Sequence, residues 1–163
     1  MGEQQKRWRR EIGLQYDTTE QMEQRLTQLT VQRQHLRAVG DAMVREFRQR
    51  FPDTPLYLTR FTDRTLNDYR WRRSSAKRWR RSATTDRQGV NLTLDLLGDT
   101  GAEILDSLPQ DTRRVWLEFE ERRLQLNFAS ACVNYERMRL RDLLERLRLL
   151  ARTRAKSVHD PGG

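Results

Sequence analysis

Hydrophobic residues in the first third of the chain recur in alternating steps of four and three residues, which is the spacing of one face of a helix. The positions in this series are Met22, Leu26, Leu29, Arg33, Leu36, Gly40, Met43 and Phe47. Arg33 and Gly40 interrupt the otherwise apolar seam, and we interpret them as a bend or as a polar device that sets the register. A seam of this length predicts a long helix that packs against a second one.

The boundaries of this helix are marked by capping and breaking residues. Asp17 can cap its start, and Glu20 stands three residues later, as in a capping box. Pro52 and Pro55 disfavour a helical conformation beyond Phe51. The spacing therefore predicts a helix from 17 to about 51, preceded by a basic N-terminal arm that has no clear periodicity.

The middle of the chain shows the alternation of β-strands instead of helical spacing. The stretch LYLTRFT, which begins at Leu56, is rich in β-formers, and VNLTLDL, which begins at Val90, alternates apolar and polar residues. Both stretches are expected to be strands of a small antiparallel sheet between two long helices. The following GDTGAEILDSL is expected to form a turn and a short helical piece.

A repeated motif lies between these two stretches. YRWRR at 69–73 and KRWRR at 77–81 are near copies, and KRWRR also occurs in the N-terminal arm. If the chain folds back around Ser75, Trp71 lies opposite Trp79 and the arginines of the two copies face one another. This symmetry predicts a β-hairpin, although its turn lacks the Gly or Asn that such turns favour.

The last third of the chain carries two apolar stripes at helical spacing. The first consists of Leu117, Leu124, Phe128, Ala131, Tyr135 and Met138, and the second of Leu126, Ala129, Val133, Leu140, Leu143, Leu147 and Leu150. Ser107 or Asp111 can cap this helix, and Pro109 suits its first turn. Together the stripes form a face wide enough for more than one neighbour. We expect the helix at 111–154 to pack on the first helix and to bind a protein partner or a second copy with the remaining apolar surface.

These elements predict a mostly α fold with a small inserted antiparallel β-sheet, an α+β architecture in which two long helices form an antiparallel helical hairpin. The length of 163 residues suits one domain. We expect a basic arm over 1–16, a single domain over 17–155 with its sheet at 56–97, and a disordered tail over 156–163.

Positive charge is abundant and unevenly distributed. The net charge is +9, and lysine occurs only three times among the 32 basic residues. Residues 64–87 contain nine basic and two acidic residues, whereas residues 98–121 contain seven acidic and two basic ones. A balance this basic favours nucleic acid as the partner, DNA before RNA, and the guanidinium groups suit phosphate. Two alternatives stay open: the codon bias of a GC-rich genome also enriches arginine, and the acidic segment could neutralise the basic one.

The arginine-rich hairpin and arm carry the candidate binding residues. These are Arg70, Trp71, Arg72, Arg73, Lys77, Arg78, Trp79, Arg80, Arg81, Arg7, Arg9 and Arg10. The tryptophans of the hairpin can be interpreted in two ways, as platforms for base stacking or as buried anchors that pack the sheet onto the helices. In both cases the arginines are expected to contact phosphates, and the arm is expected to be mobile.

The sequence does not indicate an enzyme, a metal site or a cofactor. His35 and His159 form no triad or metal cluster with Cys132, and P-loop, dinucleotide and HExxH motifs are absent. Cys132 is the only cysteine, which precludes an intrachain disulfide, and its apolar neighbours suggest a small core residue. Because no run of about 18 apolar residues occurs, we expect a cytoplasmic protein without a membrane partner.

The order of a long helix, a sheet that carries YRWRR at 69–73, and another long helix resembles small uncharacterised proteins of integrating conjugative elements in proteobacteria, some of which are labelled integrase regulators. The resemblance implies a role in a mobile genetic element and assigns no functional residue. The first hypothesis is a non-enzymatic nucleic-acid-binding accessory or regulatory protein. The alternative is a coiled-coil adaptor or effector that binds an acidic or helical protein, with the sheet as its specificity element.

Overall fold

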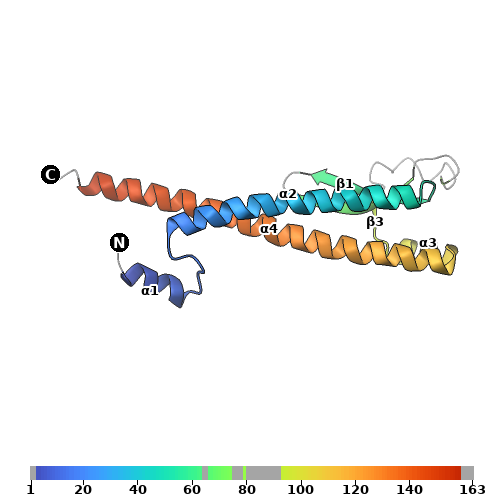
Figure 1. The fold of residues 1–163 in the computed structure, drawn as a ribbon, viewed down its shortest axis with the longest axis horizontal. Coiled ribbons are helices and arrows are strands. Elements are labelled where there is room, and N and C mark those ends of the chain that lie inside the picture. Colours follow the sequence, from blue (N-terminus) through green and yellow to red (C-terminus); the bar gives the residue numbers. More distant parts are fainter. Residues whose placement is uncertain (1–2, 64–65, 75–78, 80–92, 159–163) are drawn as a thin grey trace. The chain divides into compact units, whose positions relative to one another are not determined.

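The computed structural model describes residues 3–63, 66–74, 79 and 93–158 (Figure 1). In chain order the elements are α1 (Glu3–Glu11), α2 (Thr19–Arg50), β1 (Leu56–Asp63), β2 (Leu66–Arg73), β3 (Thr93–Leu94), α3 (Asp99–Ser107) and α4 (Gln110–Val158). The predicted fold class, mostly α with a small inserted antiparallel sheet, is confirmed.

The chain divides into two compact units, each of which contains a part of both long helices. The first unit is formed by residues up to Arg33 and by those from Cys132 onward, and the second by Gln34–Ala131. A single domain over 17–155 stays a prediction, because α2 and α4 both continue from one unit into the other.

In the first unit, α2 and α4 bury a seam between them. The buried residues are Met22, Leu29, Val133, Asn134, Leu140 and Leu144. The guanidinium of Arg25 donates to both carboxylate oxygens of Glu136 at 2.9 Å, and Arg148 donates to Glu23 at 2.7 Å. Because the earlier residue of α2 pairs with the later residue of α4, the two helices run antiparallel here.

A tyrosine ties the segment before α2 to the same carboxylate. The Tyr16 hydroxyl donates to Glu136 Oε1 at 2.7 Å. Hydrogen bonding from Arg25, and more weakly from Tyr16, lowers the pKa of Glu136 although its partial burial opposes this. A carboxyl with a lowered pKa stabilises the folded state above its unfolded pKa, and this contribution disappears as the pH falls through the folded value.

The N-terminal arm contains a helix that its sequence pattern did not indicate. After α1, Leu14 N–H donates to the Arg9 carbonyl at 2.8 Å and Gly13 N–H donates to the Arg10 carbonyl at 3.0 Å. Gly13 has a φ of 70°, so this is a Schellman motif with glycine in the left-handed conformation. α1 buries no side chain, and the arm is therefore helical without joining an apolar core.

The start of α2 differs by one residue from the predicted cap. Thr18 Oγ1 accepts a hydrogen bond from Gln21 N–H at 3.1 Å, and Gln21 Oε1 accepts one from Asp17 N–H at 2.7 Å. Thr18 therefore caps the helix in place of Asp17, and the Gln21 side chain reaches back to the backbone one residue before this cap. The end of α2 at Arg50 agrees with the prediction from the prolines.

The sheet of the second unit has the order β1-β2-β3 and is antiparallel. β1 and β2 pair along their whole length, from Leu56 opposite Arg73 to Asp63 opposite Leu66. β3 pairs with β2 only at Trp71–Leu94 and Arg72–Thr93. The strand predicted from Leu56 is confirmed, whereas Val90 and the two residues after it lie outside the described part of the chain.

The predicted hairpin of 69–73 with 77–81 is wrong at its centre, because Trp71 has partners in β1 and β3 on its two sides. Trp71 lies between Leu58 and Leu94 instead of opposite Trp79. The predicted pairing would have placed arginines directly opposite one another, which is unfavourable. Pairing with β1 instead brings apolar residues of both strands to one face of the sheet.

The core of the second unit is built around aromatic rings. Trp71 stacks on Trp116 with 5.4 Å between ring centroids. Phe47 makes edge contacts with Trp71, Trp116 and Phe119 at 5.1, 5.4 and 5.2 Å. Because these rings come from α2, β2 and α4, they join both long helices and the sheet in one core.

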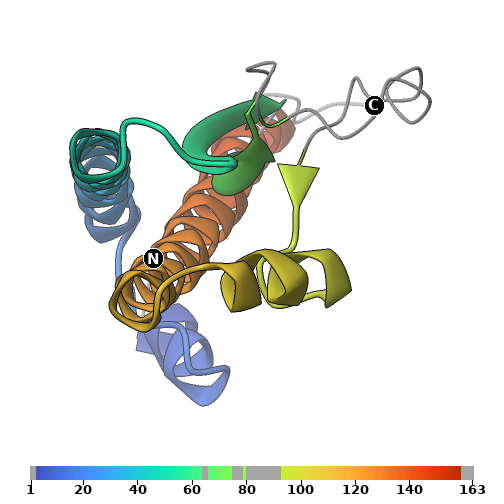
Figure 2. The same cartoon turned by 90° about the vertical axis from the view of Figure 1, so that its right-hand side faces the viewer.

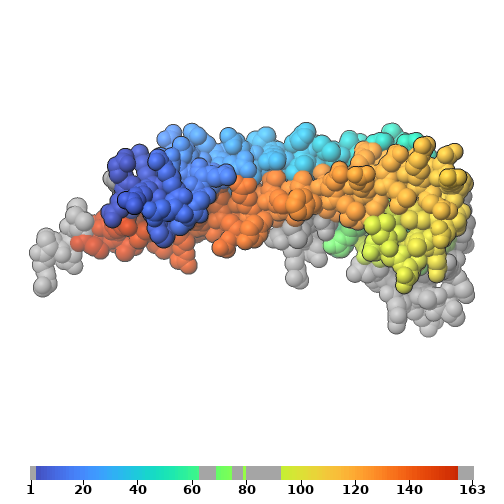
Figure 3. All heavy atoms as spheres, turned by 90° about the horizontal axis from the view of Figure 1, so that it is seen from below, coloured from blue at the N-terminus to red at the C-terminus, as the bar shows by residue number. Residues whose placement is uncertain are grey.

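α3 packs beside α4 and completes this core. In Figure 2, α4 lies between α2 and α3 with the sheet beside all three, and Figure 3 shows α3 against the first turns of α4. Leu105 of α3 is buried in the cluster. Arg113 of α4 donates to the carbonyls of Leu105 at 2.9 Å and Asp106 at 3.3 Å, which satisfies the C-terminal end of α3.

Of the two stripes predicted on α4, the second is buried in part, with Leu150 at its end 44% exposed, and none of the first is buried. Leu126, Val133 and Leu140 of the second stripe are buried, whereas the first stripe exposes Leu117, Leu124, Phe128 and Tyr135 by 40, 46, 73 and 68%. Cys132 is also exposed, contrary to its predicted core position. α4 continues to Val158, so residues 156–158 are helical and not part of a disordered tail. Residues 159–163 lie outside the described residues.

Gly40 makes room for a tyrosine of the sheet. A Cβ atom at this position would lie 2.1 Å from Cζ of Tyr69. The Tyr69 hydroxyl lies 3.0 Å from both the Arg37 carbonyl and Asp41 Oδ1. Burial, followed by the hydrogen bond to Asp41, raises the pKa of Tyr69.

Gly40→Ala tests this contact, because helix propensity and overpacking predict opposite changes in the free energy of unfolding. Helix propensity alone would stabilise α2 by about 1 kcal/mol. Overpacking against Tyr69 should instead lower the free energy of unfolding by ~1–3 kcal/mol. Urea denaturation followed by circular dichroism measures the difference. As a control, the same substitution in a Tyr69→Leu background should stabilise; a stabilising Gly40→Ala in the wild type would contradict the contact.

Candidate nucleic-acid interface

A buried carboxylate of α4 holds the central strand of the sheet. Glu120 is only 2% exposed, and its oxygens accept hydrogen bonds from Trp71 Nε1 at 2.6 Å and from Arg123 Nε and NH2 at 2.7 and 2.8 Å. A buried charge is tolerated only when it is paired and its hydrogen-bonding capacity is used. Trp71 and Arg123 together meet this requirement.

An asparagine of α4 continues the ladder of the sheet where β3 ends. Asn127 Oδ1 accepts the Tyr69 N–H and Asn127 Nδ2 donates to the Tyr69 carbonyl, both at 2.9 Å. Arg123 NH1 donates to the same carbonyl at 3.1 Å. Tyr69 and Trp71 present their backbone groups to the same edge of β2, since they are two residues apart. The side chain of Asn127 therefore replaces a strand at Tyr69.

These contacts determine which residues of β1 and β2 face away from the core. Alternate residues point to opposite sides of a sheet, so burial of Leu56, Leu58, Tyr69 and Trp71 turns their neighbours outward. The residues turned outward are Tyr57, Thr59 and Phe61 of β1 and Arg70 and Arg72 of β2, and we refer to them as the outer sheet face. Tyr57 is partly buried, with part of its side chain against the core. Arg60, in contrast, turns to α2 and pairs with Asp41 at 2.8 Å.

The outer sheet face combines aromatic rings with guanidinium groups. Tyr57 lies directly opposite Arg72 in the sheet. The guanidinium of Arg70 lies over the ring of Phe61, 4.1 Å from its centroid, which is a close cation–π contact. Arg72 and the adjacent Arg73 are exposed, whereas Tyr57, Phe61 and Arg70 are half-buried. Aromatic side chains interleaved with arginine are typical of surfaces that bind nucleic acid.

The two tryptophans of the predicted site have different surroundings. Trp71 is 1% exposed and packs in the core, so it is an anchor and not a platform for bases. Trp79 is 39% exposed, and its indole N–H donates to Asp53 Oδ1 at 3.0 Å. The predicted residues Lys77, Arg78, Arg80 and Arg81 lie outside the described part of the chain.

The arginines of the N-terminal arm make local contacts. Arg7 pairs with Glu11 at 3.0 Å, and Arg10 approaches Asp17 at 3.8 Å. Arg9 donates to the backbone carbonyl of Asp17. All three belong to the first unit, whereas the outer sheet face belongs to the second. Exposed pairs of this kind contribute little to stability and leave the arginines able to exchange partners.

Sequence reasoning missed the aromatic half of the outer sheet face and its support. The alternation in LYLTRFT could have revealed Tyr57 and Phe61, because it places them on the face of the strand that points away from Leu56 and Leu58. Glu120 belongs by its position in the sequence to the acidic segment at 98–121. No local signal distinguishes it from its exposed neighbours, since its burial depends on the indole that the sheet brings to it.

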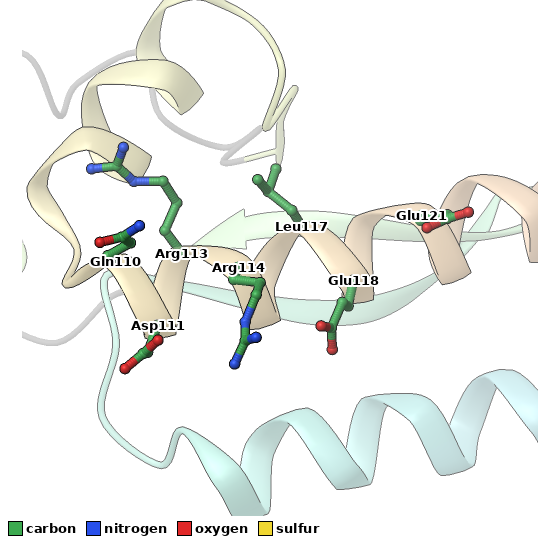
Figure 4. Close-up of a pocket in the computed structure, with 7 residues that line it drawn as sticks. All are labelled: Gln110, Asp111, Arg113, Arg114, Leu117, Glu118 and Glu121. Carbon is green, nitrogen blue, oxygen red and sulfur yellow. The ribbon is translucent and has the colours of Figure 1, made fainter.

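The beginning of α4 also carries a shallow pocket of mixed charge (Figure 4). Its lining residues are Gln110, Asp111, Arg113, Arg114, Leu117, Glu118 and Glu121. All of them come from the first turns of one helix, and both carboxylates and guanidinium groups are among them. In the acidic segment, Asp106 and Glu120 pair with Arg113 and Arg123 of α4. For these two acids, the neutralising arginines lie on α4 and not in the basic segment.

Within the described residues, no three His, Cys, Asp or Glu side chains are grouped as ligands for a metal ion. None of the helices, over the ranges that the structure describes, has both the length and the apolar character needed to cross a bilayer. No protein-family model matches the sequence, and neither the curated proteins nor the solved structures with which it was compared show a match.

Replacing Arg123 tests whether the buried cluster supports the sheet. Arg123→Met leaves the Glu120 carboxylate buried with one hydrogen-bond partner fewer, which should lower the free energy of unfolding by ~3–5 kcal/mol. Arg122→Met is the matched control, because Arg122 forms an exposed pair with Glu46 at 2.7 Å and should cost about 1 kcal/mol or less. Urea denaturation measures the free energy of unfolding of both variants. Equal losses of this free energy would show that the buried cluster supports the sheet no more than an exposed ion pair does.

Proposed function

We propose that this protein is a non-enzymatic nucleic-acid-binding accessory or regulatory protein. The observation that carries the proposal is the outer sheet face, where Arg70 and Arg72 alternate with aromatic residues on strands held firmly by α4. A rigid strand presents its side chains at fixed spacing, which lowers the entropy lost when a repeating phosphate backbone is bound.

Charge supports the same ligand class. The chain has a net charge of +9, and the segment at 64–87 that contains β2 holds nine basic residues. Guanidinium groups form paired hydrogen bonds with phosphate oxygens. Each phosphate that is neutralised releases condensed counterions, so the affinity should fall steeply as salt rises.

The cellular role that we propose rests on the sequence resemblance. A regulator of a bacterial mobile element would act on DNA, and DNA is therefore the nucleic acid that we propose before RNA. The arm with Arg7, Arg9 and Arg10 would add phosphate contacts to those of the sheet, as a second and separate basic segment.

A salt titration with two matched variants tests the proposal. Arg72→Ala/Arg73→Ala removes two exposed arginines of β2, and Arg45→Ala/Arg48→Ala removes two exposed arginines of α2. Fluorescence anisotropy with labelled oligonucleotides, single-stranded and duplex, gives Kd at several salt concentrations. We expect micromolar binding by the wild type at about 50 mM salt, and a slope of log K against log salt that is lower by about 2 for the β2 variant.

The α2 variant should bind within a few-fold of the wild type. Absence of micromolar binding by the wild type at low salt would contradict the proposed function. Equal losses of affinity in the two variants would contradict the assignment of the site to β2, because they would indicate that binding responds to net charge alone.

A second candidate function is that of a coiled-coil adaptor, and the exposed stripe of α4 favours it. Within the second unit, Leu117, Leu124 and Phe128 lie on one face of the helix and are 40, 46 and 73% exposed. Apolar residues at steps of seven and four form a seam for another helix. The helical partner that we propose for this seam is a second copy of the chain.

The mass in solution tests this candidate. Light scattering at about 50 μM, a concentration at which a micromolar dimer is populated, should give twice the monomer mass of 19.6 kDa. Leu124→Asp/Phe128→Asp should restore the monomer, whereas Gln125→Asp, on the adjacent exposed position, should leave the dimer intact. A wild-type monomer at this concentration would exclude self-association through the stripe.

A further inference from the structure

The outer sheet face holds two aromatic–arginine pairs. Their positions indicate whether this face suits a single strand or a duplex. Tyr57 and Arg72 are direct partners across the sheet. Phe61 and Arg70 are diagonal neighbours whose side chains meet, with the guanidinium 4.1 Å from the ring centroid. Diagonal residues in a sheet are within reach when one side chain is long. The Phe61–Arg70 pair places a flat ring beside a flat cation.

The two rings are too far apart to contact adjacent bases of a duplex. Tyr57 and Phe61 are four residues apart on β1, which corresponds to about 13 Å at the rise of a strand. Bases in a duplex are stacked at about 3.4 Å, and their flat faces are covered by their neighbours. Rings that lie on a sheet reach those faces only when the bases are unstacked, as they are in a single strand.

The arginines of the face suit the same geometry. Arg70 is held over Phe61, and a guanidinium plane can itself stack on a base. Arg72 is exposed and lies directly opposite Tyr57 on the face. It is therefore placed to contact the phosphates that link bases along the sheet. Phosphate contact alone would serve duplex and single strand alike, so the aromatic residues distinguish the two.

We infer that the outer sheet face binds single-stranded nucleic acid, with one base stacked on Tyr57, another on the Phe61–Arg70 pair, and a phosphate between them bound by Arg72. This inference rests on the proposed function and names its ligand more closely. Each stacked base should contribute about 10-fold to the affinity. That contribution is absent for a duplex, whose bases stay paired.

The test compares a labelled 12-nucleotide single strand with the 12-base-pair duplex of the same sequence. Tyr57→Leu/Phe61→Leu removes both rings and keeps the charge and apolar character of the face. We expect this variant to lose at least 10-fold in affinity for the single strand and to bind the duplex within about 2-fold of the wild type. Tyr135→Leu removes an exposed aromatic residue of α4 outside the proposed dimer seam and should change neither affinity.

A ring-swapped variant separates stacking from folding. Tyr57→Phe/Phe61→Tyr keeps two aromatic rings, so it should retain at least a third of the wild-type affinity for the single strand. Preferential binding of the wild type to the duplex, or equal losses for both ligands in the leucine variant, would overturn the inference and leave the proposed function standing. If the wild type binds neither ligand at low salt, the proposed function itself fails.

Discussion

The buried carboxylate of Glu120 determines where the sheet lies on α4. Its partners, the indole of Trp71 and the guanidinium of Arg123, satisfy a charge that would otherwise be costly in the core. Asn127 binds the backbone of Tyr69 on the same edge of β2. A slip of β2 by one residue would break both sets of contacts and would turn the arginines into the core. Hydrophobic burial favours a sheet at this place, and the polar contacts select its register.

That register connects the core to the proposed activity. With Tyr69 and Trp71 buried, Arg70 and Arg72 must face outward, and pairing with β1 places Tyr57 and Phe61 beside them. Trp71, the tryptophan of the repeated motif, thus has a structural role, while its neighbours Arg70 and Arg72 form the surface. Stability and binding would then depend on opposite faces of the same two strands.

Local periodicity predicted the long helices and the first strand, because each depends on residues close in sequence. The seam of α2 and the alternation in LYLTRFT are examples of this. The repeated RWRR led to the wrong prediction that Trp71 pairs with Trp79. Trp71 is instead buried by Phe47 and Trp116, which are distant in sequence. The two stripes of α4 looked equivalent for the same reason. Only the positions of the sheet and α2 decide which stripe is buried, and a single helix carries no information about them.

Photocrosslinking tests the central claim, that the outer sheet face binds unpaired bases, most directly. The wild-type protein would be bound to a single strand that contains 5-bromouracil at every position, irradiated, digested and analysed by mass spectrometry. The account predicts crosslinks at Tyr57 or Phe61 in the peptide that contains β1, since these rings are proposed to stack on the bases. Crosslinks confined to Trp8, Trp79 or the exposed stripe of α4 would contradict it.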